Sequence, residues 1–169
     1  FRRVPSDLKR LWADENLPGV PCYEDYKEMI DKENLDMVDV CTPSYLHADM
    51  SVYCLNHGLN VLCEKPMTLC GADADRVLAA AEKTDKFFMI AHVVRFMRAY
   101  AYLKKVVDEK KHGNLVRLDM KRFSSIPRWS WNNWFLDEKL SGGVTTDLSI
   151  HDLDFVQSML GKPDSVESF

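Results

Sequence analysis

The sequence predicts an α/β fold with a parallel sheet, followed by the beginning of a second α/β unit. Three short apolar runs, at residues 37–41, 60–63 and 87–91, alternate with helical patterns of about ten residues or more. Strands separated by such helices pair in parallel, and runs without polar alternation fit strands that are buried on both faces. Beyond residue 113 the pattern changes to alternation at period two, which is typical of a strand with one solvated face.

The helical patterns have start and stop signals that fix their approximate limits. Leu17-Pro18-Gly19 ends the first pattern, and Gly58 follows the third in the position where a helix usually places glycine. The last pattern turns the apolar side chains of Tyr100, Leu103, Val106 and Val107 to one side. In chain order, the predicted helices cover residues 7–15, 23–31, 47–56, 72–83 and 97–111.

The second unit is predicted to be incomplete. It offers a strand over 116–121, a tryptophan-rich connection, a helix after Gly142-Gly143 and a second strand over 165–169. A half-exposed sheet of so few strands is marginal by itself. We therefore expect two domains, residues 1–112 and 113–169, of which the second is only begun.

Composition narrows the class of protein. Of the 169 residues, 46% are hydrophobic and 28% charged, which is typical of a globular chain, and the net charge of −4 argues against a nucleic-acid partner. A run of about 18 apolar residues is absent, so no membrane span is expected. The five cysteines lack C-x-x-C spacing, which favours reduced thiols in a cytoplasmic protein, with Cys41 and Cys63 as small hydrophobic side chains.

The three predicted strands end in residues that can do chemistry. They are followed by Thr42-Pro43, by Glu64-Lys65-Pro66, and by His92 with Arg95. Ligands of open parallel sheets bind beyond the carboxyl ends of the strands, so these groups line one crevice if the strands are neighbours. Lysine is rare at the mouth of a buried strand, although a salt bridge with Glu64 or an exposed ammonium group would also explain Lys65.

The helix after Gly142-Gly143 carries a narrow polar strip. At about 100° per residue, Asp147, His151, Asp154 and Ser158 fall on one side, edged by apolar residues. A histidine with a carboxylate four residues earlier can act as a general base that the carboxylate supports. Two other interpretations remain open: metal ligands supplied from one helix turn, or a structural aspartate near a core histidine.

An aromatic and basic cluster precedes the glycine pair. Tryptophan faces suit sugar rings, which makes Arg122 and Trp134 candidates for substrate contact, whereas packing or subunit contact is the other interpretation. The cluster consists of Arg122, Arg128, Trp129, Trp131 and Trp134.

Taken in order, these motifs resemble the Gfo/Idh/MocA oxidoreductases from about Pro21 to the end of the chain. The resemblance rests on the run from Val38 to His47, on Glu64-Lys65-Pro66, on His92 to Phe96, and on Ser141-Gly142-Gly143 through Asp147 and His151 to Asp154. It implies a Rossmann domain followed by an α/β domain whose open, largely antiparallel sheet forms homo-oligomers, as dimers or tetramers.

The resemblance also implies an activity: hydride transfer between NAD or NADP and a sugar, an inositol or a related polyol. Lys65 would contact the reacting hydroxyl, Asp147 would bind substrate, and His151 would accept or donate the proton, with no metal. Pro66 is often cis in this motif. By the same analogy, the residues along the cofactor would be Thr42, Pro43, His47, Glu64, Lys65, Pro66 and His92.

The sequence departs from the family pattern in two places. The N-terminal G-x-G-x-x-G loop, which holds the pyrophosphate of a dinucleotide on a helix N-terminus, is absent, so we expect this chain alone to bind cofactor poorly. Val93 stands where many relatives carry asparagine. Rival interpretations are a non-catalytic dinucleotide-sensing regulator, an NAD-dependent glycosidase and a metal-dependent hydrolase.

Overall fold

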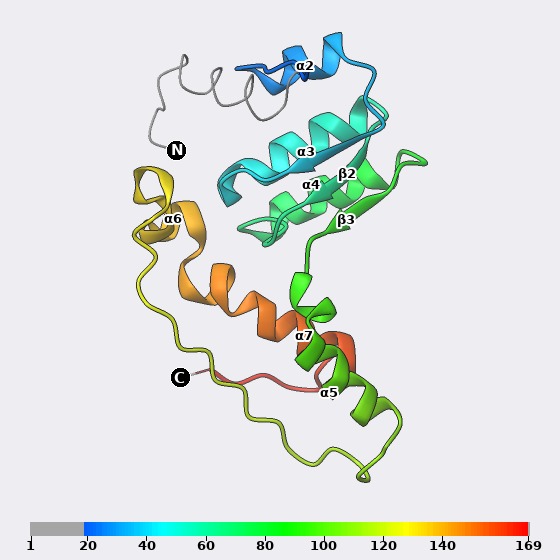
Figure 1. Ribbon diagram of the computed structural model, residues 1–169, viewed down its shortest axis with the longest axis vertical. Coiled ribbons are helices and arrows are strands. Elements are labelled where there is room, and N and C mark those ends of the chain that lie inside the picture. The colour runs from blue at the N-terminus through cyan, green and yellow to red at the C-terminus, as the bar shows by residue number, and fades with distance from the viewer. Residues whose placement is uncertain (1–18, 169) are drawn as a thin grey trace.

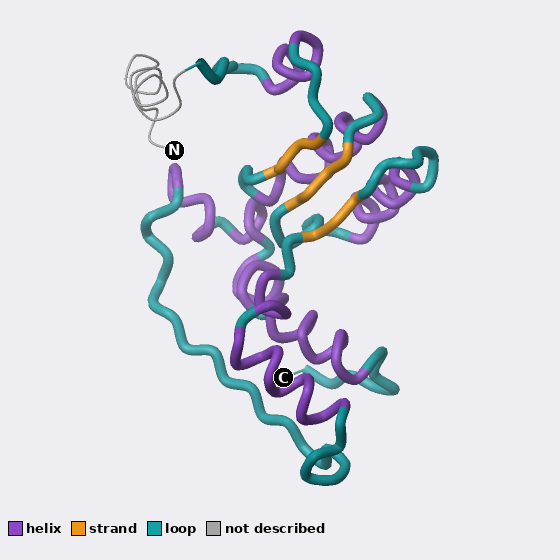
Figure 2. The backbone as a smooth tube through the Cα atoms, turned by 45° about the vertical axis from the view of Figure 1, so that its right-hand side comes forward, coloured by secondary structure: helices purple, strands orange, loops and turns teal. Residues whose placement is uncertain are grey.

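A computed structural model of the protein describes residues 19–168 (Figure 1). The first half is a small parallel sheet with helices beside it, and the second half is helical, with long loops (Figures 1 and 2). The strands of the sheet are β1 (Met37–Val40), β2 (Asn60–Cys63) and β3 (Phe88–Ile90). Its α-helices are α2 (Tyr26–Lys32), α3 (His47–Asn56), α4 (Gly71–Ala81), α5 (Arg98–Asp108), α6 (Glu138–Ser141) and α7 (Ile150–Leu160).

Four helical turns of other types accompany the α-helices in the described chain. Three are 3₁₀ turns, and the fourth, immediately before α7, is a π turn. They are η1 (Ser44–Leu46), η2 (Val93–Phe96), η3 (Trp131–Leu136) and η4 (Val144–Leu148).

The three strands confirm the predicted parallel α/β arrangement. They lie in the order β1-β2-β3, and both pairs are parallel. The register aligns Val40 with Cys63 and Cys63 with Ile90, so the three strands end side by side. The residues that follow each strand are therefore brought to one edge of the sheet.

The hydrophobic core lies between one face of the sheet and its helices. Val40, Val61 and Cys63 turn to this face, where Leu55 of α3 and Ala80 of α4 pack against them. Period-two alternation places the intervening strand residues on the opposite face.

That opposite face is open, which corrects the expectation of strands buried on both faces. Met37 is 55% exposed and Met89 is 57% exposed. Within residues 19–168, the helices that pack on the sheet cover only the core face.

Local sequence signals explain most element limits. The helix predicted over 47–56 and the strand predicted over 60–63 have the same limits in the structure, whereas α2 begins three residues later than predicted. The reason is Asp25, whose side chain accepts a hydrogen bond of 2.9 Å from the amide of Lys27 and so caps the helix. The helix predicted over 7–15 lies outside the described residues.

In the second half, α5 packs against α7. The rings of Tyr100 and Phe155 meet edge to face with their centroids 4.9 Å apart, and Phe155 is fully buried. A long loop then leads from α5 back to α6, which contacts η1 beside the sheet (Figure 1). Residues distant in sequence thereby reach the carboxyl edge of the strands.

The strand predicted over 116–121 is wrong for the described chain, because this segment is an irregular loop. Val116 is 96% exposed, and within the described residues no neighbouring strand satisfies the backbone of this segment. An alternating pattern alone does not make a strand, since the ladder needs a partner. Residues 165–168, where the second strand was predicted, are also irregular, and Phe169 lies outside the description.

Along residues 19–168, no helix is both long and apolar enough to cross a membrane. All five cysteines are free thiols. Cys63 is fully buried, as its apolar surroundings predict, but Cys41 is exposed, because β1 ends one residue earlier. The domain boundary near residue 113 stays a prediction.

Candidate functional site

A cavity of about 1270 Å³ opens at the carboxyl edge of the sheet. One wall comes from the turns after β1 and β2, and the other from the tryptophan-rich segment and the π turn η4. Of the predicted site residues, those that line it are Thr42, Pro43, Glu64, Lys65, Arg122, Trp134 and Asp147.

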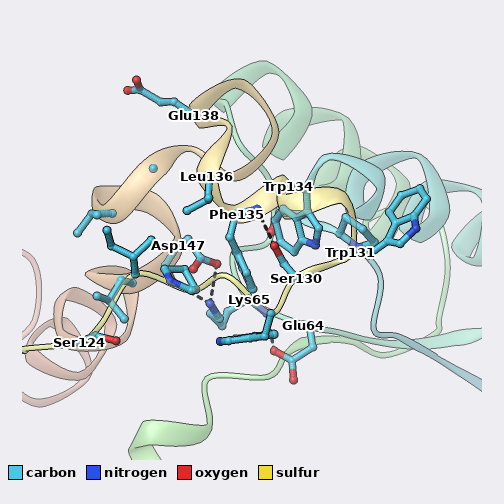
Figure 3. A pocket seen from close by; sticks show the side chains of 18 of the residues that line it. Glu64, Lys65, Ser124, Ser130, Trp131, Trp134, Phe135, Leu136, Glu138 and Asp147 are labelled. Carbon is cyan, nitrogen blue, oxygen red and sulfur yellow. Dashed lines mark hydrogen bonds and ion pairs between the residues drawn. The ribbon is translucent and has the colours of Figure 1, made fainter. Parts of the chain in front are cut away.

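At its centre, Lys65 and Asp147 form an ion pair. Lys65 Nζ lies 2.9 Å from Asp147 Oδ1 and 2.7 Å from the Asp147 carbonyl oxygen, and both side chains are more than four-fifths buried. Figure 3 shows the two side chains directed toward each other, whereas Glu138 points outward. The structure thus joins two predicted catalytic residues that are 82 positions apart in the chain.

The glycine pair explains how Asp147 reaches Lys65. Gly142 has φ +74°, and a Cβ atom at this position would lie 2.5 Å from Cβ of Thr146. The chain can therefore fold η4 directly onto the end of α6 only if this residue is glycine. The amide of Ser149 donates to the carbonyl of Val144, five residues earlier, which is the pattern of a π turn.

The π turn divides the polar strip predicted from Asp147 to Ser158. Asp147 lies in η4 and faces Lys65, whereas Asp154 lies in α7 and pairs with Arg95. The hydroxyl of Ser158 donates to the carbonyl of Phe155 in its own helix. Ser158 therefore has a structural contact and does not line the cavity.

Two histidines predicted to belong to the site, His92 and His151, do not line the cavity and have ring nitrogens without a partner among the described residues. Nδ1 of His92 and Nδ1 of His151 are buried and have no hydrogen-bond partner among the described residues. Burial lowers the pKa of His151, and the charge of Lys65 lowers it further. Burial also lowers the pKa of His92, against the opposing effect of Asp154. Both imidazoles are therefore neutral at neutral pH.

A further ion pair joins the turn after β3 to α7. Arg95 Nε donates to Asp154 Oδ2 over 2.7 Å, and Nη2 of the same guanidinium contacts Asp154 Oδ1, which lies 3.4 Å from His92 Nε2. Sequence reasoning had noticed Arg95 and Asp154 separately but not their pairing. The ordered motifs give the residue types, whereas the pairing depends on how α7 packs on η2.

Arg122 lines the cavity but is already engaged. Its Nε and Nη2 donate to the two carboxylate oxygens of Asp152 over 2.7 and 2.8 Å, and Nη2 also contacts the hydroxyl of Tyr100. The hydrogen bond with Arg122 lowers the pKa of Asp152. Sequence reasoning missed Asp152, because it lies off the polar strip. Arg128 does not line the cavity.

The tryptophan-rich segment forms an aromatic wall. Trp134 stacks in a tilted arrangement on Phe135, with ring centroids 4.0 Å apart, and both line the cavity (Figure 3). Asn132 and Asn133 between the tryptophans have φ values of +49° and +53°. Asparagine tolerates this left-handed conformation better than most residues, which allows the chain to turn sharply here.

His47 and Pro66, both predicted to lie along a cofactor, do not line the cavity. His47 is 1% exposed, and both of its ring nitrogens face carbonyl oxygens of the protein. Pro66 is buried and follows a cis peptide bond, as the resemblance suggested.

The metal interpretation has little support from this geometry. Among the described residues, no group of three or more histidine, cysteine, aspartate or glutamate side chains converges as metal ligands would. Asp147 and Asp154, two of the three candidate ligands, are each paired with a cation instead.

Comparison with known proteins decides the family. The family described as "Oxidoreductase family, NAD-binding Rossmann fold" matches residues 5–92, more than half of the chain, and the "GFO/IDH/MocA C-terminal domain" matches residues 100–169. The chain belongs to the Gfo/Idh/MocA family. This membership confirms the resemblance and the Rossmann-like parallel sheet.

This Gfo/Idh/MocA chain is similar to several named enzymes. Myo-inositol 2-dehydrogenase of Thermotoga maritima is 30% identical over 88% of this chain and 43% of its own length. The 2,7-anhydro-N-acetylneuraminate hydratase of Mediterraneibacter gnavus is 30% identical over 81% of this chain and 36% of its own. The crystal structure of myo-inositol 2-dehydrogenase from Lactobacillus plantarum superposes with a TM-score of 0.75 at 31% identity, covering 90% of this chain and 46% of that one. The chain thus spans less than half the length of these relatives.

The position of the cavity fits the ligand site of an NAD-binding Rossmann fold. Its floor is the carboxyl edge of a parallel sheet, where such folds bind ligands, and Thr42, Pro43 and Glu64 line it. Nδ1 of His92 and Nδ1 of His151 are buried polar atoms that no hydrogen bond of the described residues satisfies.

Proposed function

We propose that the protein is an NAD(P)-dependent dehydrogenase that acts on a CH–OH group of a sugar, an inositol or a related polyol. The observation that carries the proposal is the ion pair between Lys65 and Asp147 at the cavity, with His151 near enough to Lys65 for that charge to lower its pKa. Family membership and the inositol dehydrogenases among the relatives support it.

Each residue has a role that follows from its charge and position. When bound along Thr42, Pro43 and Glu64, the nicotinamide supplies the acceptor or donor of the hydride. His151 takes the proton of the substrate hydroxyl, and the ammonium of Lys65 stabilises the developing alkoxide. Asp147 holds Lys65 in place and accepts a hydrogen bond from a neighbouring hydroxyl of the substrate.

The electrostatics suit a base at neutral pH. Because burial and the nearby Lys65 and Arg122 lower the pKa of His151 below the ordinary value of 6.5, its imidazole is unprotonated at pH 7. We expect kcat/KM for oxidation to stay level through neutral pH. It should fall only at a pH below 6.5, where His151 gains its proton.

The test uses the full-length protein with NAD and NADP and a panel of inositols and sugars, following reduced nicotinamide. We expect His151→Ala to lower kcat by about 10²-fold or more, with little change in the dissociation constant of the dinucleotide. His112→Ala, which removes an exposed histidine, is the matched control and should keep full activity. An unchanged kcat in His151→Ala would remove His151 from the catalytic role.

A second candidate, favoured by the relative named as a hydratase, is a reaction without net oxidation. An enzyme of that kind, or an NAD-dependent glycosidase, would form product without accumulating reduced nicotinamide. A dinucleotide-sensing regulator would bind NAD(P) and turn over nothing on the panel. Stoichiometric formation of reduced nicotinamide and ketone separates the dehydrogenase from all three.

We also infer a cytoplasmic homo-oligomer, a dimer or tetramer formed through the sheet of the second domain. The exposed apolar side chains of Val116, Phe123 and Ile126 support it, because they lie on the segment that begins this domain. The mass of the full-length protein in solution, measured by light scattering, tests it: a monomer at micromolar concentration would contradict it.

A further inference from the structure

A buried histidine connects the two turns that form the floor of the cavity. His47 begins α3 and is 1% exposed. Its Nδ1 lies 2.8 Å from the carbonyl oxygen of Pro66, and its Nε2 lies 2.9 Å from the carbonyl oxygen of Thr42. Thr42 belongs to the turn after β1, and Pro66 to the turn after β2.

The backbone hydrogen bonds that join β1 to β2 stop at the ends of the strands, and the contacts of His47 join the chain beyond that point. Between the two turns, the backbone hydrogen bonds of the described chain end where the amide of Glu64 donates to the carbonyl of Val40. Past that point, the two turns contribute Thr42 and Lys65 to the lining of the cavity. The imidazole of His47 lies within hydrogen-bond distance of a carbonyl oxygen in each turn.

Both contacts of the His47 ring require the imidazole to be the hydrogen-bond donor. Carbonyl oxygens only accept, so each contact needs an N–H on the ring nitrogen that faces it. A neutral imidazole makes one of the two hydrogen bonds, and the doubly protonated ring makes both. An apolar side chain of similar size would make neither and would leave two carbonyl groups without this partner.

We propose that His47 is a positioning residue, which ties the two turns together and so holds Lys65 in place against Asp147. The proposal rests on the proposed function, because it concerns the role of Lys65 there. It gives His47 a part in the reaction without contact with cofactor or substrate.

The kinetic test is a double-mutant cycle in the full-length protein. We expect His47→Leu to lower kcat about tenfold or more, since displacement of a catalytic group by about 1 Å can cost on the order of 10²-fold. In a Lys65→Met background the same change should lower kcat by less than about twofold, because the group it positions is gone. His47→Gln, whose amide can donate to one carbonyl, should recover part of the loss.

A structural control separates positioning from loss of stability. Leu55→Ala removes a core side chain of the same helix that touches neither carbonyl, and should destabilise the fold by about 2–5 kcal/mol while the folded protein keeps its kcat. An unchanged kcat in His47→Leu, or an equal loss with and without Lys65, would overturn the proposal.

Hydrogen exchange supplies a readout that does not depend on activity. His47→Leu should speed amide exchange in residues 41–46 and 64–69 but not in α7, whereas unchanged exchange in these turns would overturn the proposal even if no substrate is found. If exchange rises but Lys65→Met has the kcat of the wild type, the proposed function fails at Lys65. The tie between the turns would then stand without its catalytic consequence.

Discussion

At the scale of single residues, the site depends on Lys65 and Asp147 acting together. Each is mostly buried and lies 2.9 Å from the other, so loss of one leaves the other charge without its partner. We predict that Lys65→Met and Asp147→Asn each lower kcat/KM about 10²-fold, and that the double variant is little slower than either, because residues that act as a unit are not additive. Lys104→Met, which breaks an exposed pair with Asp108, is the control and should change kcat/KM little.

The cycle is measured by steady-state kinetics of the full-length enzyme on its best substrate. Losses that simply multiply in the double variant would show that the two residues act independently, against the geometry in Figure 3.

The sequence predicted these residues well and their partners poorly. Residue type and order single out Lys65, Asp147 and His151, because a lysine after a strand or a carboxylate four residues before a histidine can be seen in one segment. The pairs Arg95–Asp154 and Arg122–Asp152 bring distant segments together, so they depend on packing that local pattern does not contain. The same holds for His47, whose ring faces two carbonyls that no spacing rule predicts.

At the scale of elements, the π turn η4 is the feature that places Asp147. We predict that Gly142→Ala lowers both stability and kcat, because its new Cβ would collide with Thr146 and displace the turn. Gly58→Ala is the matched control: it has the same φ of +74° with open space around it, so it should cost only about 1–2 kcal/mol of stability and leave kcat unchanged.

Urea unfolding and kcat measured on both variants check this prediction. Equal effects of the two substitutions would mean that the close approach of Thr146 does not matter for the site.

Element type follows from periodicity where neighbours are close in sequence, and fails where they are not. The limits of α3 and β2 were predicted correctly, because their stop signals are local. The π turn interrupts a helix predicted to be continuous, since a rare i to i+5 hydrogen bond leaves no mark on an apolar pattern. The segment 116–121 alternates like a strand, but within the described chain it has no partner to pair with.

At the scale of the whole molecule, the two partly buried histidines His92 and His151 connect stability to pH. Burial lowers the pKa of both His92 and His151 below the ordinary value of 6.5, so the unfolded chain binds protons more readily than the folded one. We predict that the free energy of unfolding falls as the pH drops below 6.5 and that the fall from this source ends once the folded histidines are also protonated.

Urea unfolding at several pH values measures this dependence, and the variant His92→Phe should reduce its slope in the same window. Protonation of Asp152 also lowers the free energy of unfolding, but only at a pH below the ordinary aspartate pKa of 3.8, because the pKa of Asp152 is lowered in the folded protein. If the free energy of unfolding did not change as the pH drops below 6.5, the lowered pKa values of His92 and His151 would be contradicted.

Isotope transfer shows whether hydride passes between a carbinol carbon and the nicotinamide. The full-length protein is given NAD(P) and its best polyol substrate with deuterium on the reacting carbon, and the reduced nicotinamide is analysed by mass spectrometry. We expect the deuterium to appear in the reduced nicotinamide. We expect His151→Ala to form this product at a rate that is lower by about 10²-fold or more. Product formed with the deuterium lost to solvent, or retained with no reduced nicotinamide, would contradict it.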